Sequence, residues 1–130
     1  MAYSVLVVDD EPMARTMLRL ILVRAGFDVR EAEDGKTALA EVARIIPDLM
    51  ILDIMMPGID GFEVCSKLRG DVNTSDLPII MLSAKTDAQS VEKGLQLGAN
   101  RYLTKPVGPD ELTKHVREVL SIEDEIPSQN

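Results

Sequence analysis

Three carboxylates stand where apolar runs of the chain end. Asp9 and Asp10 follow the run 4–8, and Asp53 follows the run 49–52. Burial disfavours the charged form of a carboxylate and neighbouring carboxylates repel one another, so such residues are costly unless they have a role. A divalent cation removes the repulsion, and Mg²⁺ takes oxygen ligands while it keeps several waters. The three residues therefore indicate a Mg²⁺ site, in which Mn²⁺ can substitute.

A serine and a lysine end two further runs. Ser83 follows the run 77–82, and Lys105 follows the run 101–104. Lys105 offers one compact positive charge, and Ser83 offers one hydroxyl donor. A cation, an ammonium group and a hydroxyl around a free carboxylate suit a phosphoryl group, because phosphoryl transfer depends on positioning and charge neutralisation. Asp53 is then the nucleophile that accepts this group.

Strand-like runs alternate with helical patterns five times along the chain. We expect strands over 4–8, 27–32, 48–52, 77–82 and 101–104, and helices from 12 to before 26, over 37–46, 61–69 and 88–97, and from 109. This alternation predicts an α/β fold, a doubly wound parallel sheet with helices on both faces in three αβα layers. Sites in such sheets form beyond the carboxyl ends of the strands, so the polar residues should share one crevice.

Composition limits the remaining classes. The 130 residues carry a net charge of −8, which argues against nucleic-acid binding by this domain. One domain is expected over 1–121, with an acidic tail or linker over 122–130. No run is long enough to span a membrane, no secretory leader is read, and the single cysteine, Cys65, excludes an intrachain disulfide. A cytoplasmic protein is the expectation.

Several residues have an ordinary explanation when taken alone. Acidic residues are favourable at a helix N-terminus, a serine or a lysine is common on a surface, and Tyr102 can be a core aromatic. Arg15 and Arg19 suggest a solvated helix face, and His115 a surface position. Cys65 is expected as a small buried residue, and the methionines as core filler.

Four stretches of the chain match a known family pattern. They are 7–11, 52–58 together with 60–61, 81–84, and 102–106. On these residues the chain resembles the receiver domain of bacterial response regulators, the partners of sensor histidine kinases, over about residues 4 to 121. The resemblance implies the flavodoxin-like strand order 2-1-3-4-5 of the chemotaxis receiver, with five helices.

The resemblance also implies roles around the acidic site. Asp53 would be the phosphoacceptor and a metal ligand, Asp10 a direct ligand, and Asp9 a ligand mainly through water. The backbone carbonyl of Met55 would be a further ligand. Lys105 would contact the phosphoryl group.

Other residues match switch and tuning positions of the family. The bond before Pro106 would be cis. Ser83 would be the hydroxyl that moves to the phosphoryl group, and Tyr102 the aromatic that turns inward with it. Both would bias a surface formed by the fourth helix, the fifth strand and the fifth helix. Met55 and Lys85 sit where self-dephosphorylation is tuned, and neither orients water well, so a long-lived phosphorylated form is expected.

The expected partners are a sensor histidine kinase or a histidine phosphotransfer protein, and an output protein or domain that the sequence does not identify. A homodimer that forms on phosphorylation is a further expectation. The chain would not be an enzyme in the usual sense, because it acts only on itself.

Three alternatives stay open at this stage. One is an interaction domain that works without phosphorylation. Another is an aspartyl-phosphate phosphohydrolase of the haloacid dehalogenase type, although Asp53 is followed by Ile54 and Met55 and lacks the second aspartate. A third is a nucleotide or flavin binder, although no phosphate-binding loop follows the first strand.

Overall fold

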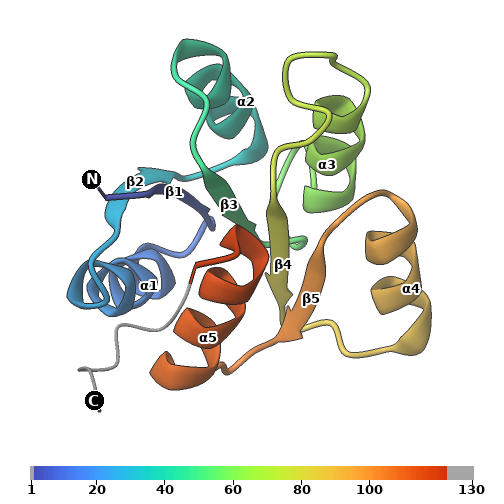
Figure 1. Ribbon diagram of the computed structural model, residues 1–130. Coiled ribbons are helices and arrows are strands. Elements are labelled where there is room, and N and C mark those ends of the chain that lie inside the picture. The colour runs from blue at the N-terminus through green and yellow to red at the C-terminus, as the bar shows by residue number, and fades with distance from the viewer. Residues whose placement is uncertain (1, 123–130) are drawn as a thin grey trace.

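The computed structural model describes residues 2–122, which form one αβα sandwich (Figure 1). The strands are β1 (Ser4–Val8), β2 (Asp28–Ala32), β3 (Leu49–Leu52), β4 (Ile79–Ser83) and β5 (Arg101–Thr104). The helices are α1 (Pro12–Arg24), α2 (Gly35–Arg44), α3 (Gly61–Arg69), α4 (Ala88–Gln96) and α5 (Pro109–Leu120). All strand pairs are parallel, in the order β2-β1-β3-β4-β5, which confirms the predicted topology.

Two apolar clusters cover the two faces of the sheet. Helices α1 and α5 pack on one face, and α2, α3 and α4 lie over the other (Figure 1). Every residue of the central strands β3 and β4 is buried, whereas β2 at the edge is mostly half-buried. This burial explains why the central strands read as unbroken apolar runs. The polar residues that follow them are the exceptions that need an explanation.

The second helix differs from its predicted range. It begins at Gly35, because the side chain of Asp34 accepts a hydrogen bond from the amide of Thr37 at 2.7 Å and caps the helix. It ends at Arg44, so Ile45 and Ile46 are exposed and do not continue the buried face. Pro47 explains the early end, since the residue before a proline avoids the helical region.

Other boundaries shift by one or two residues. The strand β4 begins after Pro78, which has no amide to donate to a neighbouring strand. The prediction of methionines as core filler is right for Met50, Met56 and Met81 but wrong for the exposed residues Met13, Met17 and Met55. On α1 the contact with the sheet falls to Leu18 and Leu22, which are buried.

The C-terminal end of the described chain is packed. The helix α5 ends at Leu120, and its C-cap residue Ser121 has a left-handed conformation. Ile122 is half-buried against the α1–α5 face of the core. The rest of the expected tail, 123–130, lies outside the described residues. Within residues 2–122, no helix has the length and apolar character needed to cross a membrane.

Candidate functional site

The register of the sheet brings the acidic residues together. Val8 on β1 pairs with Leu52 on β3, so the residues that follow these strands lie at the same level. The amide of Asp53 donates to the carbonyl of Val8 at 3.0 Å, which ties the end of β3 to the end of β1. As a result, carboxylate oxygens of Asp9, Asp10 and Asp53 all lie within 4.8 Å of one another. The expected cluster of three carboxylates is therefore present.

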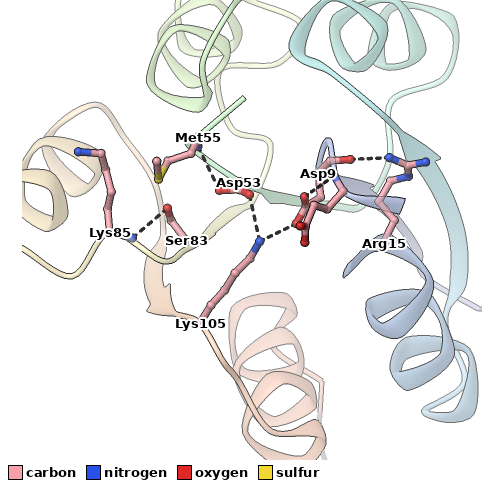
Figure 2. A network of polar contacts seen from close by, with 8 residues as sticks. Asp9, Arg15, Asp53, Met55, Ser83, Lys85 and Lys105 are labelled. Atoms are coloured by element: carbon pink, nitrogen blue, oxygen red, sulfur yellow. Dashed lines mark hydrogen bonds and ion pairs between the residues drawn. The ribbon is translucent and has the colours of Figure 1, made fainter. Parts of the chain in front are cut away.

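The end of β5 adds a positive charge to this cluster. The amide of Lys105 donates to the carbonyl of Ser83 at 2.9 Å, and the Lys105–Pro106 bond is cis, as expected. The ammonium nitrogen of Lys105 lies 2.7 Å from Oδ2 of Asp9 and 3.0 Å from Oδ2 of Asp53 (Figure 2). Burial of Lys105 lowers its pKa, but the hydrogen bonds to Asp9 and Asp53 and the negative charges of these two carboxylates together outweigh burial, so the pKa is raised.

The three carboxylates differ in their exposure to solvent. Asp9 is 1% exposed and Asp53 is 6% exposed, whereas Asp10 is open to solvent. Asp9 is already engaged by Lys105 and by the amide of Glu11, which donates to Oδ1 at 2.9 Å. Asp10 is thus the carboxylate that is free to approach a hydrated cation. Three clustered carboxylates with an open side fit Mg²⁺, which prefers oxygen ligands and retains water.

A close contact between backbones holds the loop after β3. The other oxygen of Asp53, Oδ1, accepts a hydrogen bond from the amide of Met55 at 3.1 Å. The amide of Gly61 donates to the carbonyl of Ile54 at 2.9 Å, and a Cβ on Gly61 would collide with the carbonyl of Asp53. Only glycine lets α3 start against the acidic strand end. The sequence pattern contained Gly61 but did not indicate this contact.

The expected switch residues share one loop contact. Ser83 is fully buried, and its Oγ accepts a hydrogen bond from the amide of Lys85 at 3.3 Å. The phenol of Tyr102 donates to the carbonyl of Lys85 at 2.7 Å. Both side chains therefore meet the same residue of the β4–α4 loop. No hydrogen bond among residues 2–122 joins Ser83 to Asp53, so the switch role stays a prediction.

One residue expected on a solvated face belongs to the site instead. Only 17% of the Arg15 side chain is exposed. Its Nη1 donates to the backbone carbonyl of Asp9 at 2.7 Å (Figure 2). Its Nε donates to Oε1 of Glu31 at 3.2 Å. The prediction for Arg15 was wrong because helical spacing shows which residues share a face but not which loop carbonyl lies beside it. Arg19, in contrast, is 58% exposed, as expected.

Fold and site together define a class of protein. They define a flavodoxin-like α/β domain with a cluster of three carboxylates and one lysine at the carboxyl edge of its sheet. Residues 5–117 match the family model of the response regulator receiver domain. The chain belongs to this family, which confirms the resemblance read from its motifs.

Relatives in curated sequences are response regulators. The chain is 43% identical over 129 residues to the DNA-binding response regulator MtrA of Mycolicibacterium smegmatis, covering 99% of this chain and 55% of that protein. It is 41% identical over 123 residues to the DNA-binding dual master transcriptional regulator RpaA of a Synechocystis species, covering 95% of this chain and 51% of that protein. The chain thus spans about half the length of the curated relatives it matches.

Solved structures share the fold over nearly the whole chain. A putative response regulator from Chloroflexus aurantiacus superimposes with a TM-score of 0.90 at 40% identity, covering 93% of this chain and 99% of that one. The chemotaxis protein CheY4 of Vibrio cholerae superimposes with a TM-score of 0.87 at 34% identity, covering 92% and 99%.

Proposed function

We propose that this receiver domain accepts a phosphoryl group on Asp53 in the presence of Mg²⁺ and that the modified domain then controls a partner. The carrying observation is the position of the Lys105 ammonium group between Asp9 and Asp53. It lies beside a buried carboxylate in a cluster that also fits a hydrated cation. This arrangement suits the handling of charge during phosphoryl transfer better than it suits acid-base catalysis.

The transfer needs little covalent chemistry from the protein. A carboxylate oxygen of Asp53 attacks phosphorus, a new O–P bond forms, and the P–N bond to a phosphohistidine of the donor protein breaks. The electron pair of that bond stays on the histidine nitrogen. Lys105, which binds Asp53 from the end of β5, would contact the incoming phosphoryl oxygens. Bound Mg²⁺ would neutralise phosphoryl charge, held by Asp10, Asp53, the Met55 carbonyl and, through water, Asp9.

The donor in this proposal is a sensor histidine kinase or a histidine phosphotransfer protein. The modified Asp53 would draw in the Ser83 hydroxyl and the Tyr102 ring, and this shift would bias the surface formed by α4, β5 and α5. Ser83 and Tyr102 both form a hydrogen bond with the backbone of Lys85, which supports a coupling in which movement of one side chain would affect the other. The domain would act only on itself and would have no external product, so we do not propose an enzyme.

The output remains a protein partner or a further domain. MtrA and RpaA are described as DNA-binding, but the chain covers only 55% and 51% of those proteins. The net charge of −8 argues against contact with DNA by the receiver domain itself. We further propose that phosphorylation leads the domain to form a homodimer. The proposed location of the protein is the cytoplasm.

Labelling with a small phosphodonor tests the proposal. The full chain is incubated with acetyl phosphate and MgCl₂ and examined by intact mass and by size-exclusion chromatography. We expect the mass of one phosphoryl group on wild type, loss of this mass in Asp53→Asn, and loss without Mg²⁺. Asp28→Asn, which changes an exposed carboxylate on β2, is the matched control and should label normally. Equal labelling of Asp53→Asn, or none of wild type, would overturn the assignment.

A further inference from the structure

Arg15 on α1 is a basic residue whose side chain contacts the backbone of the acidic site. It cannot be a metal ligand, because a guanidinium group is positive and has no acceptor. Its Nη1 instead donates to the backbone carbonyl of Asp9 at 2.7 Å (Figure 2). The side chain is only 17% exposed, and this hydrogen bond is partly buried. The contact is therefore to the backbone that carries the carboxylates and not to the carboxylates themselves.

All four polar groups of Asp9 are engaged. Its amide donates to the carbonyl of Ala32 at 3.2 Å, and its carbonyl accepts from Arg15. Its Oδ1 accepts from the amide of Glu11 at 2.9 Å, and its Oδ2 accepts from Lys105 at 2.7 Å. The loop between β1 and α1 is thus held at Asp9 from β2, from α1 and from the end of β5.

Asp10 depends on that restraint. Its side chain is exposed, and none of the hydrogen bonds among residues 2–122 holds its carboxylate. The carbonyl of Asp9 and the amide nitrogen of Asp10 belong to one planar peptide group. A donor that binds the Asp9 carbonyl therefore also sets the plane from which the Asp10 side chain departs. Arg15 supplies this donor.

Glu31 on β2 orients Arg15 for this contact. Its Oε1 lies 3.2 Å from Nε of Arg15, which leaves Nη1 directed at the Asp9 carbonyl. Arg19, one turn further along α1, forms an ion pair with the same carboxylate at 3.6 Å, but no hydrogen bond within residues 2–122 joins it to Asp9. The two arginines thus share a helix and a partner, and only Arg15 contacts the loop.

We propose that Arg15 is a positioning residue for the cation site: it holds the peptide group between Asp9 and Asp10 so that the Asp10 carboxylate meets the ion. The inference rests on the Mg²⁺ site of the proposed function. Residues that orient metal ligands commonly account for a 10- to 100-fold difference in metal affinity.

The charge of Arg15 and its positioning of Asp10 should change the metal affinity in opposite directions, which makes the proposal testable. A positive charge near a cation site repels the ion, so removal of Arg15 should strengthen binding if charge alone matters. If Arg15 positions Asp10, its removal should weaken binding despite the lost repulsion. Arg15→Met keeps most of the apolar stem and removes the guanidinium group, so it preserves packing while testing the contact.

Titration calorimetry of the full chain with MnCl₂, and separately with MgCl₂, measures the affinity for each cation without any phosphodonor. We expect Arg15→Met to bind about tenfold more weakly than wild type. Arg19→Met, the matched control, should remain within about twofold or bind slightly more tightly. Thermal unfolding of each variant shows whether it is folded. Wild-type or tighter affinity in a folded Arg15→Met would overturn the proposal.

Two further variants separate the possible failures. Asp10→Asn should abolish most of the binding, and if wild type shows no Asp10-dependent binding, the metal site of the proposed function fails instead. If Arg15→Met does not fold, Arg15→Lys decides the question. Lysine keeps the positive charge, but its single ammonium group cannot reproduce the contacts of the guanidinium group with both Glu31 and the Asp9 carbonyl. Weaker binding by folded Arg15→Lys supports the proposal, and unchanged binding overturns it.

Discussion

Lys105 and Asp53 lie 52 residues apart in the sequence, and a 3.0 Å ion pair joins Nζ of Lys105 to Oδ2 of Asp53. The same ammonium group also binds Asp9, so one lysine neutralises part of a cluster of three carboxylates. Lys105 therefore supplies a positive charge to two of the three carboxylates, Asp9 and Asp53. Its removal should reveal how the cluster behaves without an internal cation.

We predict that Lys105→Met is less stable than wild type without divalent cations. Addition of Mg²⁺ should raise the free energy of unfolding of this variant by more than it raises that of wild type. Loss of the ammonium group leaves Asp9 and Asp53 facing each other with no positive partner. Breaking a buried pair costs about 3–5 kcal/mol, and partial exposure of Lys105 reduces the expected loss to about 1–3 kcal/mol. Urea unfolding with and without MgCl₂ measures both effects.

The matched control for that change is Lys114→Met, on the exposed side of α5. It removes one ammonium group of the same kind away from the carboxylates. Its stability should change little and should respond to Mg²⁺ as wild type does. An equal response of Lys105→Met and Lys114→Met would contradict a special role for Lys105.

Gly94 on α4 is expected to resist substitution. A Cβ at this position would lie 2.7 Å from Sδ of Met81 and 3.0 Å from Cδ2 of Tyr102. Met81 is fully buried and cannot move aside freely, so the ring of Tyr102 or the helix must shift. We predict that Gly94→Ala loses about 1–3 kcal/mol of unfolding free energy, although alanine favours a helix by about 1 kcal/mol.

Gly70→Ala provides the comparison. The nearest atom to its Cβ would be the carbonyl oxygen of Ser66 at 3.5 Å, an ordinary contact, and its φ of −81° suits alanine. This variant should be as stable as wild type or slightly more so. If chemical unfolding shows the same change for both variants, the packing of Tyr102 against α4 does not limit position 94.

Phosphoryl loss from Asp53 is expected to be slow, and an amide near the site should accelerate it. Met55 and Lys85 line one hollow beside the loop after β3. Neither a thioether nor an ammonium group is expected to orient a water molecule for attack. Met55→Gln would place an amide there, and we predict hydrolysis several-fold faster than in wild type. Intact mass at intervals after removal of acetyl phosphate measures the decay.

Met17→Gln, at an exposed methionine on α1, makes the same chemical change away from the hollow. Its decay should match that of wild type. If the phosphorylated form of wild type lasts only seconds, the expected slow hydrolysis is contradicted. Equal decay of Met55→Gln and wild type would contradict the role of position 55.

Acid should weaken the cap of α2. The pKa of Asp34 is lowered, first by the backbone hydrogen bond from Thr37, so the folded protein favours the ionised form. Because the folded pKa lies below the unfolded value of about 3.9, the stabilisation is present above that pH and is lost as the pH falls through the folded pKa. Urea unfolding of wild type and Asp34→Ala should therefore differ near neutral pH and converge in acid.

Asp34→Asn tests the cause of that convergence. Asparagine caps a helix without ionising, so the stability difference between this variant and Asp34→Ala should persist in acid. A difference between wild type and Asp34→Ala that stays constant as the pH falls would show that the carboxylate charge is not responsible.

Most of the fold and the membership of the acidic site followed from sequence. Apolar runs and helical spacing are local signals, and they located the five strands and five helices to within a few residues. Parallel strands must end at the same edge of a sheet, so residues far apart, such as Asp9 and Asp53, could be assigned to one site before any contact was known.

The tertiary structure decided which polar groups meet at that site. Sequence spacing placed Arg15 on a solvated face, but packing of α1 against β2 brings it to Glu31 and to the carbonyl of Asp9. The close approach of Gly61 to the backbone of Asp53 likewise depends on where α3 docks. These contacts join elements whose relative positions are set by burial of the whole core, and no local pattern in the chain contains that information.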